Sequence, residues 1–379
     1  MEKTHNRSIG RRIFALCPAG HSCLIFALLL IAFHILCRRY ETLCSAVYLG
    51  FARPFHRAMA LLLDRISSFA LAELLIYLAL AAAVLALVLA LWRIFTRGEK
   101  LRRCYSLAVW LLAAACGLFA GYSIFWGSYY YADDFARRNG FEAHDISTEE
   151  LETVTSYFAS LLNSYGRQVE RDEDGFYVLD KEALLEGSAS LYDRSAQLHP
   201  GLEGPRARAK AIASSRLMSY IDFTGFFFPF TGEACVNTDF PPSQFPATVA
   251  HELAHQRGAA REQDANFCAV LVCLENGQTD YCYSASMLAY IHLGNALYSA
   301  DREAWQRVYG SLEEGPLKDM ARYAAYWRQF ESPVQTVSNR VYESFLQSYD
   351  QQLGRRSYGA CVDSLVCWYL EDARAYLGK

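Results

Sequence analysis

Hydrophobic positions are distributed unevenly along the chain, and the change falls near residue 130. Before it, three apolar runs cover about 13–37, 69–95 and 104–126. Each is long enough to cross a bilayer as a helix, which takes roughly 20 apolar residues. The pattern therefore predicts a membrane domain with three transmembrane helices over residues 1–130 and a second domain over residues 131–379.

The second part of the chain has the spacing of amphipathic helices. The stretch 147-STEELETVTSYFASLLNSYG-166 begins with Ser147 and Glu150, a capping-box pair, and ends on Gly166. Further helices are predicted at about 181–192 and 206–223, and helical spacing dominates again from 262 to the end. The second domain is accordingly predicted to be mainly α.

One segment interrupts this pattern of predicted helices. Residues 223–242, FTGFFFPFTGEACVNTDFPP, are aromatic and punctuated by glycine and proline. They predict one or two short strands just before the next helix, which makes the domain α+β. Residues 230–237 are the best candidate for an edge strand to which an extended peptide could add, and the alternative is a segment that packs under the following helix.

Charge indicates how the chain is placed in a membrane. The net charge of −4 gives no support for nucleic acid as a partner. Basic residues gather in the N-terminal tail and between the second and third runs, at 93–103. Basic flanks favour the cytoplasmic side, although the first loop also carries arginines. We expect a multi-pass plasma-membrane protein with its second domain outside the cytoplasm.

The twelve cysteines divide into six at or before residue 116 and six after residue 234. In an exported domain the later six permit disulfides, and Cys273–Cys282 and Cys361–Cys367 are the locally plausible pairs. None has the C-x-x-C spacing of a thiolate zinc site.

The stretch 248-TVAHELAHQRGAAREQDANF-267 contains the strongest candidate chemistry. His251 and His255 are four residues apart, so a helix places both imidazoles on one face, where they can bind one zinc ion. Glu252 lies beside them and can take a proton from a water molecule and pass it to a leaving amine. This is the H-E-x-x-H pattern of zinc hydrolases. The alternative is an amphipathic helix with two incidental histidines.

A third protein ligand must come from beyond this helix. On a straight helix Glu262 would lie about 10 Å past His255, too far for a shared ion. A helix end at Gly258 would fold the following turn back. Glu262 is then the first candidate, with Asp264 and the more distant Glu275 as alternatives.

Other residues are candidates for supporting roles. Asp264 or Glu262 could orient a histidine instead of binding the metal. Glu233 could be a second carboxylate behind the site, and Asn266 could support the ligands or contact substrate. Tyr283 follows the motif and could donate a hydrogen bond to a tetrahedral intermediate, as could Tyr281 and His292.

The three hydrophobic runs, FPFTGEACVN and HELAHQRGAAREQDANF together resemble the bacterial membrane-protein family catalogued as domain of unknown function 3810. The likeness is sharpest across 223–267. The resemblance implies a gluzincin-type zinc metallopeptidase, with zinc bound by His251, His255 and an acidic residue of AREQDAN, and with Glu252 as base. Glu262 begins E-x-x-A-N, which resembles the E-x-x-A-D element of one branch of membrane zinc proteases, with Asn266 in place of the aspartate.

The sequence thus favours a membrane-anchored, zincin-like metallopeptidase that uses Zn²⁺ and cleaves a peptide or protein substrate near the membrane. The alternative function is a membrane sensor or scaffold whose zinc site is structural or vestigial. A transporter or channel is disfavoured, because the three runs lack paired intramembrane charges.

Overall fold

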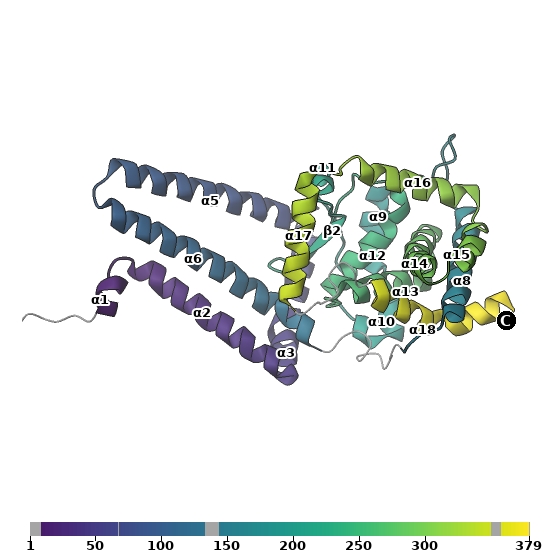
Figure 1. The fold of residues 1–379 in the computed structure, drawn as a ribbon, viewed down its shortest axis with the longest axis horizontal. Coiled ribbons are helices and arrows are strands. Elements are labelled where there is room, and N and C mark those ends of the chain that lie inside the picture. The colour runs from purple at the N-terminus through teal and green to yellow at the C-terminus, as the bar shows by residue number, and fades with distance from the viewer. Residues whose placement is uncertain (1–8, 67, 133–143, 350–357, 379) are drawn as a thin grey trace, which may run out of the picture. The chain divides into compact units, whose positions relative to one another are not determined.

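A computed structural model describes residues 9–66, 68–132, 144–349 and 358–378 (Figure 1). The chain forms two compact units. The first comprises Met1–Ala52 and Glu73–Ala132, and the second comprises Arg53–Ala72 and Asp133–Lys379. The sequence suggested one division near residue 130, whereas the structure also assigns 53–72 to the second unit. This segment covers the end of the first loop and the first four residues of the second hydrophobic run.

Three helices have the length and hydropathy of membrane spans: α2 (Pro18–Arg39), α5 (Leu71–Thr96) and α6 (Lys100–Phe125). They correspond to the three hydrophobic runs of the sequence. The first span begins later than expected because Pro18 starts α2, where a proline needs no amide hydrogen bond. The protein is therefore mainly helical, with three candidate spans near its N-terminus and a few strands.

Small and polar residues join α2 to α6. A Cβ atom at Gly20 would lie 3.0 Å from Val109 Cγ1, so the two helices approach closely there. Nearby, His21 Nε2 and the Tyr105 hydroxyl are 2.9 Å apart. No residue in the apolar window of α5 is buried. The unit also contains α1 (Ile9–Phe14), α3 (Glu41–Val47), the π-helix η1 (Tyr48–Ala52) and the 3₁₀-helix η2 (Gly127–Tyr131).

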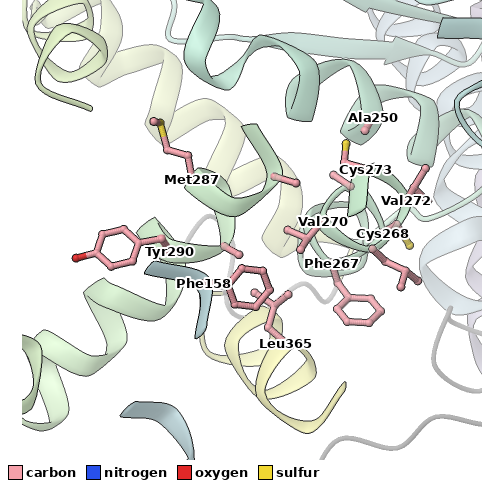
Figure 2. Close-up of a cluster of buried hydrophobic side chains, with 14 of the residues drawn as sticks. Phe158, Ala250, Phe267, Cys268, Val270, Val272, Cys273, Met287, Tyr290 and Leu365 are labelled. Atoms are coloured by element: carbon pink, nitrogen blue, oxygen red, sulfur yellow. The ribbon is translucent and has the colours of Figure 1, made fainter. Parts of the chain in front are cut away.

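The core of the second unit is built by helices far apart in sequence. Figure 2 shows side chains of this core, among them Phe158 from α8, Phe267 and Val270 from α13, Met287 from α14 and Leu365 from α18. The helix that carries both histidines, α12 (Phe245–Gln256), contributes Ala250. The other core helices are α8 (Thr148–Gly166), α13 (Glu262–Asn276), α14 (Thr279–Ala300) and α18 (Tyr358–Leu377).

Shorter helices surround this core. The helix α4 (Arg53–Ile66) precedes α5 in the chain and packs on the second unit: His56, Ala60 and Leu63 are buried, and the His56 ring meets Phe227 edge-on, 5.1 Å away. The remaining helices are α9 (Lys181–Gly187), α10 (Asp193–Leu198), α11 (Ser215–Tyr220), α15 (Arg302–Tyr309), α16 (Glu314–Arg328) and α17 (Pro333–Ser348), with 3₁₀ turns η3 (Ser188–Ser190), η4 (Pro200–Leu202) and η5 (Pro242–Gln244).

A small sheet has the strand order β1-β3-β2, with β1 at Lys210–Ala211, β2 at Gly225–Phe228 and β3 at Glu233–Val236. The strand β3 is parallel to β1 and antiparallel to β2. The prediction that 230–237 forms an edge strand is wrong, because β3 lies between the other two strands and is buried throughout. The edge strands are β1 and β2, and of these β2 approaches the helix that carries the histidines, because a Cβ atom at Gly225 would meet the Glu252 side chain.

Two helix predictions had different outcomes. The capping box of α8 is confirmed, since the Ser147 side chain accepts a hydrogen bond from the Glu150 amide. The helix predicted over 206–223 is wrong, because only α11 is helical there. In RARAKA the alanines at 207 and 209 are buried while Arg206 is exposed, which is the two-residue period of an extended chain.

All twelve cysteines are free thiols in this structure, so neither of the pairs considered from the sequence is formed. In place of a bridge, the Cys282 thiol donates a long hydrogen bond, 3.5 Å, to the carbonyl of Cys273. Cys361 and Cys367 are both on α18.

Candidate metal centre

The turn between α12 and α13 arranges the candidate site. The helix α12 ends at Gln256, and Gly258 takes φ = 94°, a left-handed conformation that glycine adopts without strain. The amide of Gly258 donates to the His255 carbonyl and the amide of Ala259 to that of Ala254, so the chain turns sharply. The helix α13 then begins at Glu262. The helix end expected at Gly258 is confirmed.

This turn brings together three groups that can bind one metal ion. Ligand atoms of His251, His255 and Glu262 all lie within 4.8 Å of one another. The Nε2 atom of His251 is 3.3 Å from Glu262 Oε2, and His255 Nε2 is 3.8 Å from Glu262 Oε1. The two imidazole rings are nearly perpendicular, with centroids 4.6 Å apart. Two nitrogens and one carboxylate form a donor set that suits zinc.

Hydrogen bonds on the far side of each ring orient the histidines. His251 Nδ1 lies 2.9 Å from the side-chain oxygen of Asn266, and His255 Nδ1 lies 2.6 Å from the carbonyl oxygen of Ala259. An oxygen of either kind accepts, so Nδ1 carries a proton and Nε2 is the nitrogen left to bind a metal. Both Nε2 atoms are the ones nearest Glu262. Such outer partners are typical of metal-binding histidines.

Glu252 is buried beside this cluster. Its side chain is on α12, the residue is only 3% exposed, and its Oε2 atom has no hydrogen-bond partner among the described residues. Burial raises the pKa of Glu252 to about 8, against the opposing charge of His251. A Cβ atom added to Gly225 of β2 would lie 2.5 Å from Glu252 Oε1. The carboxylate is therefore held directly against the edge strand.

The ligand groups influence one another electrostatically. Burial, and then the charge of His251, lower the pKa of His255 to about 4. Burial opposes protonation of His251 as well, but Glu262 overcomes it and raises the pKa of His251 to about 9. The Glu262 side chain is 24% exposed; its partial burial opposes ionisation, yet both histidines hold its pKa well below the usual range. In the absence of a metal, His251 and Glu262 share a proton. A metal cation bound by the three groups would replace that proton.

One residue of the site was missed from the sequence. The hydroxyl of Tyr342, on α17, donates a hydrogen bond of 2.7 Å to Glu262 Oε1. Its ring also packs edge-on against Phe223, 5.3 Å away. It lies 80 positions from Glu262 in a chain with 25 tyrosines, so no local signal distinguished it.

Three of the supporting residues proposed from the sequence lie outside the cluster. Asp264 is in the first turn of α13 and is not among the grouped ligands. The Tyr283 hydroxyl donates to Asp319, at 2.5 Å, in the core. Glu233 forms a buried ion pair with Lys210. Asn266, by contrast, lies at the site as the partner of a histidine.

The remaining candidates are not among the grouped ligands either. Glu275, the most distant alternative for the third ligand, pairs with His199 at 2.7 Å. Tyr281 is buried in the helical core. His292 is buried too, and burial, followed by the charge of His251, lowers its pKa to about 4. Among the described residues, the grouped ligands are therefore His251, His255 and Glu262.

Comparison with known proteins gives one result. The sequence profile of a family described as "Protein of unknown function (DUF3810)" matches residues 46–366. No curated protein and no solved structure matches the chain. The matched range includes the β2 strand, the ligand cluster and Tyr342. Because the match covers well over half of its length, the chain belongs to the DUF3810 family.

Proposed function

We propose that the protein is a membrane-anchored zinc metallopeptidase of the gluzincin type. The observation that carries the proposal is the cluster of His251, His255 and Glu262, whose ligand atoms lie within 4.8 Å. The buried carboxylate of Glu252 lies next to it. Two imidazoles and a carboxylate from two successive helices, with a glutamate next to the first histidine, form the arrangement expected of such a site.

The residues have separable roles in peptide hydrolysis. A zinc ion held by His251, His255 and Glu262 would supply Lewis-acid polarisation of the scissile carbonyl and would acidify a water molecule. Glu252 takes a proton from that water and passes it to the leaving amine. Asn266 and the Ala259 carbonyl hold the imidazoles in the metal-binding tautomer.

The sheet offers a place for the substrate. The strand β2 is at an edge and pairs with β3 on one side. An extended peptide can add to such an edge through main-chain hydrogen bonds. Gly225 at the start of β2 is in contact with Glu252, so a peptide on this edge would pass beside the base.

Placement in the cell follows from the spans and their flanks. Three helices suited to a bilayer make this a membrane protein. We propose the bacterial plasma membrane, with the second unit on the extracytoplasmic side, because basic residues gather in the N-terminal tail and between α5 and α6.

Metal analysis tests the proposal directly. The full chain, purified in detergent and dialysed against trace zinc, should hold about one zinc ion per chain by elemental analysis. His251→Ala combined with His255→Ala should lose it. The full chain is needed because a fragment starting at residue 131 would lack α4, whose buried face belongs to the second unit. Zinc content unaffected by the double substitution would refute the proposed site.

A second variant separates an enzyme from a sensor or scaffold. Glu252→Gln keeps the size of the side chain and does not alter the three ligands. For a peptidase it should retain zinc and lose peptide cleavage by several orders of magnitude. A zinc-loaded wild-type protein that cleaves no member of a peptide library would favour the sensor.

A further inference from the structure

The strand β2, proposed above to bind substrate, belongs to a small sheet that also contacts the first residues of the spanning helix α5. Within the second unit, the amides of Leu71 and Ala72 donate to the Glu233 carboxylate at 3.0 and 2.7 Å. Leu71 and Ala72 are the first residues of α5, so the carboxylate occupies the N-terminus of that helix, where negative charge is favoured. Glu233 is in β3, whose neighbour is the edge strand β2.

This connection is buried and charge-balanced. Lys210 Nζ of β1 lies 2.9 Å from Glu233 Oε1, and their side chains are 4% and 2% exposed. The same Nζ atom donates to the carbonyl of Leu63 in α4. The residues on both sides of the α4–α5 connection are therefore anchored to the sheet by one ion pair.

The edge strand β2 also packs against the residues at the start of α5. Phe226 and Phe228 of β2 lie against a buried cluster that includes Ala70 and Ala72. Phe228 is the register partner of Glu233. Substrate added to β2 would therefore lie close to the first turn of a helix suited to cross a bilayer.

The helix before this point has a face suited to lipid. Next to the buried side of α4, Leu62 and Ile66 are 50% and 67% exposed, and Phe69 just beyond is 56% exposed. Arg65 lies beside them in the last turn. Apolar side chains with a neighbouring cation, directly ahead of a span, are typical of a segment at the headgroup boundary.

Strand geometry sets the distance from this boundary to the substrate. Neighbouring strands lie about 4.8 Å apart, so a peptide added to β2 would run about 10 Å from β3. An extended chain covers that in about three residues, at roughly 3.3 Å each. The headgroup layer adds about 5–8 Å. A substrate fixed in the same bilayer would thus reach the site within about ten residues of its anchor.

We infer that the substrate is the juxtamembrane segment of a membrane-anchored polypeptide, cleaved within about ten residues of the bilayer. The inference rests on the proposed peptidase function. It makes the bilayer part of substrate selection, because a free peptide lacks the anchor that concentrates it at β2.

Reconstitution with matched reporters tests this. The full chain is placed in vesicles of phosphatidylethanolamine and phosphatidylglycerol with a reporter that carries a cassette of randomised residues. One reporter has the cassette next to a transmembrane anchor, a second has a helical spacer of about 40 residues that lifts it about 60 Å, and a third has no anchor. Cleavage is read by mass spectrometry, with Glu252→Gln as the inactive control. The cassette next to the anchor should be cut at least ten times faster than the other two.

The outcomes separate this inference from the peptidase proposal. Equal cleavage of the lifted or unanchored cassette would overturn the juxtamembrane assignment and leave the peptidase intact. No cleavage of any cassette by zinc-loaded protein would overturn the peptidase function, and this inference with it.

Discussion

Gly225→Ala is the most direct test of the contact between the edge strand and Glu252. The added methyl carbon would lie 2.5 Å from Glu252 Oε1 and 2.7 Å from its Cδ and Cγ atoms. Favourable contact begins at about 3.5 Å, so these atoms must move by about 0.8 to 1 Å. The three nearest atoms all belong to this one side chain, so the displacement falls on the carboxylate and not on the backbone.

The expected consequence is a loss of rate with little loss of metal. Misplacing a catalytic group by about 1 Å can cost roughly a hundredfold in rate, or about 2.7 kcal/mol of transition-state stabilisation. The histidines and Glu262 are not among the atoms that the methyl group would meet. Zinc content should therefore stay near the wild-type value while kcat falls about a hundredfold.

The assay uses the reporter whose cassette is next to the anchor, together with elemental analysis and thermal unfolding. Gly187→Ala is the matched control, because a Cβ atom there would meet nothing within 4 Å. It should leave the rate, the metal content and the unfolding temperature unchanged. If Gly225→Ala keeps full activity, the contact with β2 does not fix the catalytic position of Glu252, and the predicted displacement is refuted.

Three further predictions concern more distant contacts. Tyr342→Phe removes the donor to Glu262 and should weaken zinc binding about tenfold to a hundredfold, as chelator competition would measure; unchanged affinity would exclude an orienting role. Lys210→Met leaves the charge of Glu233 buried without its ion-pair partner and should destabilise the second unit by about 3 kcal/mol in denaturant unfolding; a change below about 1 kcal/mol would show that the pair does not anchor the sheet. Burial lowers the pKa of His56 to about 4, so the unfolded chain takes up this proton first as pH falls. Stability should therefore decrease between about pH 6.5 and 4, by up to about 3 kcal/mol, and His56→Gln should flatten that slope.

The sequence was most informative where the chemistry is local. The two histidines and Glu252 follow from a spacing of four on one helix, and Gly258 predicts where that helix ends. Glu262 could be preferred as a ligand because only a reversed chain can bring it back to His255. All of this depends on fewer than 20 consecutive residues, within which backbone geometry leaves few alternatives.

Long-range pairing was not predictable in the same way. Which strand lies at the edge depends on β1, a two-residue strand hidden in a segment that reads as a helix. Glu233 lies close to the motif in sequence, yet its carboxylate does not join the ligand cluster. It pairs with Lys210 and accepts a hydrogen bond from the first turn of α5. Tyr283 was favoured by proximity in sequence, but its hydroxyl bonds to Asp319.

The composition of the site favours a catalytic over a structural role for a bound metal. A structural zinc site is closed by four protein ligands, whereas three ligand groups converge here among the described residues. Beside them lies Glu252, which is buried and has one oxygen without a hydrogen-bond partner in the described part of the chain, an arrangement that destabilises a fold by about 1–3 kcal/mol. Gly225 leaves room for that carboxylate at the strand edge. A scaffold gains nothing from these features, whereas a peptidase needs an open metal position, a base and a place for substrate beside it.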